Sequence, residues 1–169
     1  LSYKESNTQA TEYTTLSTYE ISGSNYEVPI DDSAVIAIGE ANILKYGKDV
    51  TLVSFGIGIK HCLAATEELE QDGISVEIID LRTLRPLDAK AIVESVKKTN
   101  RCVTVEEGFP VCSIGNHISA MLMEHAFDFL DAPVLNCAGK DVPMPYASNL
   151  EKLALVTPSE VVTRVKELF

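Results

Sequence analysis

The sequence has few basic side chains and no long apolar run. Its 169 residues carry 14 Lys and Arg against 25 Asp and Glu, so the formal net charge is −11. A nucleic-acid surface needs Lys and Arg over a broad face, so this balance argues against one. No stretch approaches the roughly 18 apolar residues of a membrane-spanning helix, and we expect no membrane contact. The acidic surplus suits a basic protein partner, and equally a well-solvated surface.

The motifs of self-sufficient catalytic sites are also missing. The sequence contains no HExxH, no cysteine–histidine cluster with zinc spacing, no GxSxG and no Walker loop. We therefore expect neither a metal site nor a complete active site. No two of the four cysteines have CxxC spacing, and we interpret them as reduced core thiols in an intracellular compartment: Cys62, Cys102, Cys112 and Cys137.

Two regions differ in composition. Residues 1–26 are dominated by Ser, Thr, Asn, Tyr and Gln, and their few aliphatic residues have no period. Such a stretch cannot bury enough apolar area to offset the entropy of ordering it, so we predict a polar linker or extended tail. A globular domain is predicted over residues 27–169.

Strands alternate with helices along this domain. Apolar, β-branched runs predict four strands, at 49–55, 75–81, 101–107 and 132–138. Residues with helical periodicity follow each of them. Residues 34–44 are a candidate edge strand. The alternation predicts an α/β three-layer sandwich, with a mostly parallel sheet of about five strands and helices on both faces. Asp88 is expected to cap one helix, and Thr157, Pro158 and Glu160 form a capping box at the last one.

A glycine-bearing turn raises a dinucleotide hypothesis. Gly56 and Gly58 follow the first strand, and Asp80 ends the second strand where a ribose-binding acid belongs. The third position of the GxGxxG fingerprint holds His61, which favours a tight turn instead. A stand-alone nucleotide-binding α/β enzyme remains the alternative hypothesis.

Several further polar residues can be interpreted as either structural or catalytic. Glu106 and Glu107 follow the third strand, where paired acids serve acid–base chemistry or brace a loop. Because neighbouring strand residues point to opposite faces, only one of the two can face a given site. His117 and His125 are interpreted as core or interface histidines of the following helix.

The charged stretch "DLRTLRPLD" after the second strand is interpreted as a structural brace. Arg82 and Arg85 are expected to hold carboxylates and loop carbonyls with their planar forks, beside Asp80 and Pro86. A phosphate clamp is the alternative.

Five stretches together resemble one family: "GKDVTLVSFGIG", "IIDLRTLRPLD", "SVKKTNRCVTVEEGFP", "FDFLDAP" and "DVPMPYASNLEKLAL". They are similar, in order from Pro29 to Phe169, to the C-terminal half of pyruvate dehydrogenase beta subunits. That half is the transketolase C-terminal domain of thiamine-diphosphate-dependent 2-oxoacid dehydrogenases.

The resemblance implies oxidative decarboxylation of pyruvate, with acetyl transfer to lipoyl groups, by the complete enzyme. It places thiamine diphosphate between the alpha subunit and the other half of beta, so no catalytic or cofactor-binding residue carries over to this chain. The implied partners are the alpha subunit, a second beta subunit and the subunit-binding domain of dihydrolipoyl acetyltransferase. The implied compartment is the mitochondrial matrix, or the cytoplasm of a bacterium.

In this family, a small basic domain docks on acidic side chains and on the chain end of beta. The matching candidates are Asp141, in the proline-bearing loop "DVPMPY", and Phe169. Lys140 stands where the family has a small residue, and we expect it to weaken the local negative field.

Overall fold

The computed structural model describes residues 38–169, of which Gly39–Phe169 form one unit. The predicted linker at 1–26, the predicted domain start at residue 27 and most of the candidate edge strand lie outside the described residues. Those boundaries stay predictions.

Five strands form one sheet in the order β1-β3-β2-β4-β5. Four are parallel and lie inside the predicted ranges: β2 (Val50–Ser54), β3 (Val76–Asp80), β4 (Cys102–Val105) and β5 (Leu135–Cys137). The fifth, β1 (Asn42–Lys45), overlaps the end of the candidate edge segment and pairs with β3 antiparallel. Every residue of β2 is buried, as expected of a strand covered on both faces.

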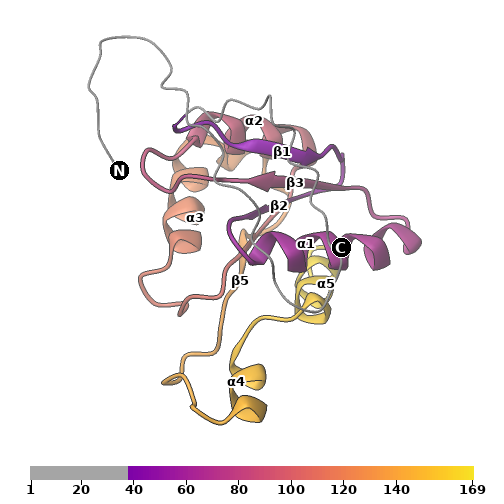
Figure 1. Ribbon diagram of the computed structural model, residues 1–169. Helices are drawn as coiled ribbons and strands as arrows, with labels where there is room; N and C mark the ends of the chain where they lie inside the picture. The colour runs from indigo at the N-terminus through magenta and orange to yellow at the C-terminus, as the bar shows by residue number, and fades with distance from the viewer. Residues whose placement is uncertain (1–37) are drawn as a thin grey trace, which may run out of the picture. The chain divides into compact units, whose positions relative to one another are not determined.

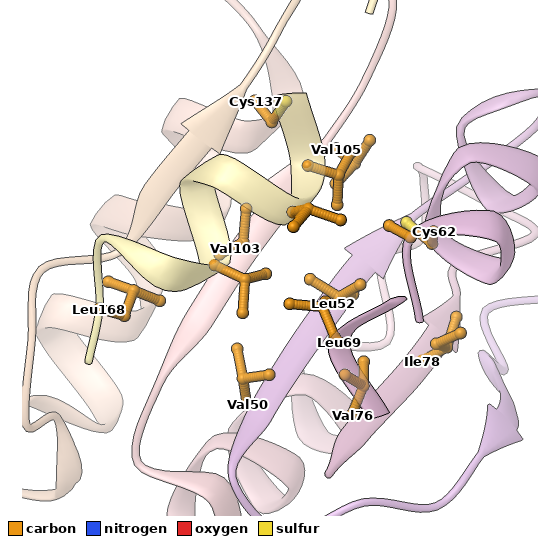
Figure 2. Packing of buried hydrophobic residues seen from close by; sticks show 14 of the residues in the cluster. Val50, Leu52, Cys62, Leu69, Val76, Ile78, Val103, Val105, Cys137 and Leu168 are labelled. Carbon is orange, nitrogen blue, oxygen red and sulfur yellow. The ribbon is translucent and has the colours of Figure 1, made fainter. Parts of the chain in front are cut away.

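Helices cover both faces of this sheet (Figure 1). On one side, α1 (Gly58–Gln71) and α5 (Pro158–Lys166) enclose the apolar cluster shown in Figure 2, which includes Leu52 and Leu69. On the other, α2 (Ala89–Thr99) and α3 (Ile114–His125) pack on a second cluster that includes Val53 and Ile79. Because successive strand residues point to opposite faces, Leu52 and Val53 serve different cores. The predicted three-layer α/β fold is confirmed.

The expected helix caps are present. The Asp88 carboxylate accepts the backbone N–H of Ala91 at 3.0 Å at the start of α2. Asn100 ends that helix in the left-handed region at φ 62°, which Asn tolerates better than most residues. At α5, Thr157 and Glu160 exchange the reciprocal bonds of a capping box, with Pro158 in the first turn.

The structure differs from the sequence prediction near the C-terminal end. A short helix, α4 (Ser148–Ala154), which buries only Ala154, lies in a region that the sequence predicted as a loop. Its seven residues are too few for an apolar period to distinguish a helix from a loop. The helix that carries His125 ends at that residue, and Phe129 lies in a separate 3-10 turn (η1, Phe127–Phe129) and is 42% exposed.

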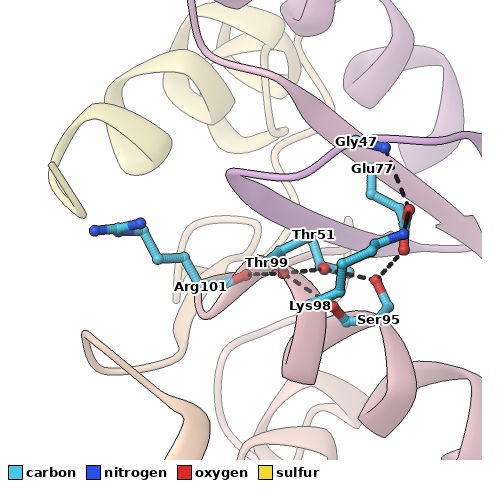
Figure 3. Close-up of polar contacts among 7 residues, drawn as sticks. All are labelled: Gly47, Thr51, Glu77, Ser95, Lys98, Thr99 and Arg101. Carbon is cyan, nitrogen blue, oxygen red and sulfur yellow. Dashed lines mark hydrogen bonds and ion pairs between the residues drawn. The ribbon is translucent and has the colours of Figure 1, made fainter.

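A polar network is buried where β2 and β3 begin (Figure 3). Glu77 of β3 is fully buried, and its carboxylate accepts bonds from Ser95, Lys98 and the backbone N–H of Gly47. The hydroxyl of Thr51 joins Ser95 and Thr99 at 2.7 Å each. A buried charge of this kind has to be paired. Here Ser95 and Lys98 of α2, together with the Gly47 N–H, compensate the Glu77 carboxylate.

Among residues 38–169, no helix is long and apolar enough to cross a membrane. The same residues contain no group of three or more His, Cys, Asp or Glu side chains placed to hold a metal ion.

Candidate functional site

The carboxyl ends of β2, β4 and β5 meet at one edge of the sheet, where Glu106 follows β4. Glu106 is only 5% exposed, and its Oε1 accepts the Gly115 N–H at 3.0 Å and the Asn136 amide at 3.3 Å. A Cβ on Gly115 would lie 2.5 Å from the Thr104 hydroxyl, so glycine is what allows this close approach. Glu106 thus holds the N-terminus of α3, where a negative charge is favourable.

The neighbouring acid, Glu107, faces α1 instead. One of its carboxylate oxygens is 3.6 Å from Nε2 of His61 in α1, and this ring nitrogen is buried without a hydrogen-bond partner within residues 38–169. The two adjacent acids therefore face different elements and do not form a carboxylate pair. His117 and His125 are both exposed on α3, so neither is a core histidine.

An open hollow of about 490 Å³ lies beside Glu106. Its walls combine five apolar side chains, Phe55, Leu84, Phe109, Val111 and Ile114, with five other residues, Glu106, Gly108, Cys112, Ser113 and His117. Phe109 and Val111 are 49% and 66% exposed, so apolar surface also reaches the rim. In α/β folds, ligands commonly bind at this edge of the sheet.

The N–H groups that follow the glycine turn are already used. Those of Gly58, Ile59 and Lys60 donate to backbone carbonyls three residues earlier, and a Cβ on Gly58 would lie 2.3 Å from the Ser54 hydroxyl. Asp80 does end β3, but its Oδ1 accepts the Arg82 N–H at 3.0 Å, within its own loop. The residues of the dinucleotide hypothesis therefore have local structural roles.

The loop after β3 is held differently from the predicted brace. Arg82 and Arg85 are exposed, and within residues 38–169 neither guanidinium makes a hydrogen bond or ion pair. Instead, the Thr83 hydroxyl donates to the Pro86 carbonyl at 3.0 Å and accepts the Gly39 N–H at 3.1 Å. Arg82 has φ +54°, a backbone conformation that the Asp80 carboxylate supports. The contacts that hold the loop are therefore made by Asp80, Thr83 and Pro86. The sequence did not predict the role of Thr83, because the bond of its hydroxyl to Gly39 joins residues far apart in the chain.

The two docking candidates are both at the surface, and no contact between them is found among the described residues. Asp141 is exposed, and Phe169 is 60% exposed. The Arg101 guanidinium lies 4.5 Å from the centre of the Phe169 ring, donates to the Leu168 carbonyl at 3.0 Å and approaches Asp131 to 3.6 Å. Arg101 therefore links the two residues Leu168 and Phe169, which follow α5, to Asp131 rather than to Asp141.

Lys140 is engaged by the capping box of α5. Its ammonium pairs with Glu160, the residue that also accepts the Thr157 N–H. Partial burial would raise the pKa of Glu160, but the bonds from Lys140 and Thr157 outweigh it and hold that pKa below its usual value. Lys140 thus pairs with a neighbouring acid of α5 rather than with Asp141. Its effect on the negative field near Asp141 stays a prediction.

Beyond Lys140, exposed apolar side chains gather on the segment that carries α4. This segment, residues 141–153, stands apart from the sheet in Figure 1. Its exposed large apolar residues are Val142, Met144, Tyr146, Leu150 and Leu153. Apolar side chains grouped in this way mark a surface suited to a protein contact.

Comparison with known proteins gives a consistent picture. The profile of the family described as "Transketolase, C-terminal domain" matches residues 39–161. The chain is 60% identical over 144 residues to the pyruvate dehydrogenase E1 component subunit beta of Rhizobium meliloti (strain 1021), which covers 85% of the chain and 31% of that protein. It is 49% identical to the mitochondrial E1 subunit beta of Dictyostelium discoideum, covering 85% of the chain and 42% of that protein.

Among solved structures, one match is described as "Split gene transketolase, inactive beta4 tetramer". It has a TM-score of 0.71 and 30% sequence identity, and covers 81% of this chain and 43% of that one. This chain thus spans less than half the length of these similar proteins. Because the family profile matches most of the described residues on the fold just described, the chain belongs to the transketolase C-terminal domain family.

Proposed function

We propose that this chain is the C-terminal assembly and docking domain of the beta subunit of a thiamine-diphosphate-dependent pyruvate dehydrogenase. The observation that carries the proposal is the 60% identity to a pyruvate dehydrogenase E1 subunit beta across 85% of the chain. Relatives named as mitochondrial and as bacterial support the mitochondrial matrix or a bacterial cytoplasm as its compartment.

The described residues do not fit thiamine diphosphate. Its diphosphate needs free backbone N–H groups and usually a metal ion, whereas the N–H groups of Gly58, Ile59 and Lys60 donate to carbonyls of the Gly56–Gly58 turn and its neighbours. Glu106 and Asp80 each accept a backbone N–H with one carboxylate oxygen, and Glu107 faces His61, so these acids form no cluster for a metal ion. We therefore assign the cofactor, and the decarboxylation chemistry, to parts of the enzyme outside these residues.

Assembly and docking are supported by the surface. The 141–153 segment offers apolar side chains to the alpha subunit or to a second beta subunit, and the acidic body suits the basic subunit-binding domain of dihydrolipoyl acetyltransferase. We place this docking at Asp141 and Phe169, whose side chains are both exposed.

Calorimetric titration of the chain with that subunit-binding domain tests the docking role. We expect saturable binding that weakens from low salt to about 0.15 M, because the Debye length shortens to about 8 Å. Asp141→Asn should weaken it by about 0.2–1 kcal/mol, the usual value of an exposed ion pair. Asp128→Asn is the matched control, because it removes an exposed acid in η1, away from both docking candidates, and it should leave the affinity nearly unchanged. Binding that ignores both salt and Asp141→Asn would contradict docking at Asp141.

The rival nucleotide-binding hypothesis is tested on the same preparation. NAD and thiamine diphosphate with Mg²⁺ are each titrated while the melting temperature is followed. The proposed function predicts no saturable shift with either ligand, since the N–H groups at residues 58–60 donate to backbone carbonyls and Asp80 bonds within its own loop. A saturable shift with NAD would favour the dinucleotide hypothesis.

A further inference from the structure

The hollow at the carboxyl edge of the sheet contains a carboxylate oxygen that the fold does not use. Oε1 of Glu106 accepts both hydrogen bonds of that side chain, from Gly115 and Asn136. Oε2 has no hydrogen-bond partner among residues 38–169, and it lies 3.6 Å from where a Cβ on Gly108 would stand. Glu106 and Gly108 both line the hollow, and from this we infer that Oε2 faces it.

The surroundings of Oε2 define the chemistry of a ligand. Glu106 is only 5% exposed, and a charge so poorly hydrated gains from a positively charged hydrogen-bond donor. The walls beside it are apolar and partly aromatic, with Phe55, Leu84 and Phe109 among them. A guanidinium suits both features, since it is planar, weakly hydrated and stacks on aromatic rings, and it is carried on an apolar stem.

We propose that this hollow binds the side chain of an arginine from a partner protein chain, with Glu106 as its counter-ion. Three observations favour a protein source. The hollow is open to the surface, its rim carries the exposed side chains of Phe109 and Val111, and the chain bears a net charge of −11. Its volume of about 490 Å³ is that of a side-chain or small-ligand pocket. The inference does not rest on the proposed function.

The test uses the peptide acetyl-Ala-Arg-Ala-amide and its citrulline counterpart, which has the same stem without the charge. Both are titrated into the ¹⁵N-labelled chain while the amide signals of Gly108 and Gly115 are followed. We expect saturable shifts of both signals with the arginine peptide. The citrulline peptide should bind about tenfold more weakly or worse, because it cannot form a charge-assisted bond.

Two matched variants separate the site from general electrostatics. Glu106→Gln keeps an oxygen to accept the Gly115 N–H but removes the charge, and it should weaken the arginine peptide about tenfold or more. Glu107→Gln removes the adjacent charge on the His61 side and should leave the affinity within about twofold. Equal affinity for the two peptides in the unaltered chain, or an unchanged affinity in Glu106→Gln, would overturn the proposal. So would an absence of shifts at Gly108 and Gly115 at the highest peptide concentration, which would mean that only water faces Oε2.

Discussion

At the scale of single residues, burial decides which cysteines can react. Desolvation raises the pKa of Cys62 and Cys102 to about 12 each and that of Cys137 to about 11. A hydrogen bond with Ser54 opposes the effect at Cys62 without cancelling it. Cys112 is exposed at the rim of the hollow. Because the thiolate is the reactive form, the folded chain has one thiol of ordinary accessibility.

We predict that iodoacetamide at pH 8 labels the native chain once, at Cys112. With a pKa near 12, only roughly one in ten thousand molecules of a buried thiol is ionised at that pH. Intact-mass spectrometry should show a single added group in the native protein and four after unfolding in urea. Cys112→Ser should abolish the native label. A second group added at the same rate would mean that one of the buried cysteines opens readily to solvent.

Residues whose role depends on neighbours in the sequence could be predicted, and those that depend on distant contacts could not. Asp88 and Thr157 cap helices that begin immediately after them, so spacing alone identified both. Thr83 instead bonds the backbone of Gly39, 44 residues away, and no local pattern reveals that contact. The arginines beside it drew attention by their charge, yet both are exposed to solvent.

At the scale of elements, the beginning of the sheet depends on the buried network around Glu77. Glu77 sits in β3 with both faces of the strand covered, so its charge is compensated by α2 through Ser95 and Lys98. Lys98 itself is half-exposed and also lies 5.7 Å from the Tyr46 ring centre. The network connects the turn after β1 with β2, β3 and α2, and removing one partner leaves polar groups buried without a bond.

We predict that Ser95→Ala lowers the free energy of unfolding by about 1–3 kcal/mol, the usual cost of leaving a buried polar group unpaired. Ser95 bonds both Glu77 and Thr51, so its loss affects two strands. Urea unfolding followed by circular dichroism measures the change.

Thr163→Ala is the matched control for this change. Its hydroxyl also makes a hydrogen bond, to the backbone carbonyl of Ser159 at 2.9 Å, but it is exposed on α5. The midpoint of Thr163→Ala should remain close to that of the unaltered chain. If Ser95→Ala behaved like Thr163→Ala, the network would contribute nothing to stability.

Whole elements could be predicted where burial imposes a recognisable pattern on the sequence. The fully buried runs of β2 and β4 are recognisable as strands because both faces are apolar or small. By contrast, α4 has only seven residues, six of them exposed, and so short a segment does not establish a helical period. The role of Glu106 in holding the N-terminus of α3 could not be predicted from the sequence either. Gly115 and Asn136, which bond its carboxylate, belong to two different elements.

At the scale of the whole molecule, two opposing features govern association. The 141–153 segment presents five exposed large apolar side chains, which favours contact with another copy or with a partner chain. The net charge of −11 makes two copies repel each other over distances comparable to the Debye length, about 10 Å at 0.1 M salt. Self-association should therefore strengthen with salt, whereas docking onto a basic domain should weaken with salt.

We predict that the chain self-associates reversibly through the 141–153 segment. Sedimentation velocity over a concentration series should show an average mass that rises with concentration, and more steeply at high salt, where the repulsion is screened. Leu153→Glu, which places a charge on the most exposed leucine of α4, should reduce this rise at both salt concentrations. Met123→Glu is the control, because Met123 is 53% exposed on α3, outside this segment. A strict monomer at every concentration and salt would mean that the apolar segment serves a different partner chain. Equal effects of the two variants would instead locate self-association outside it.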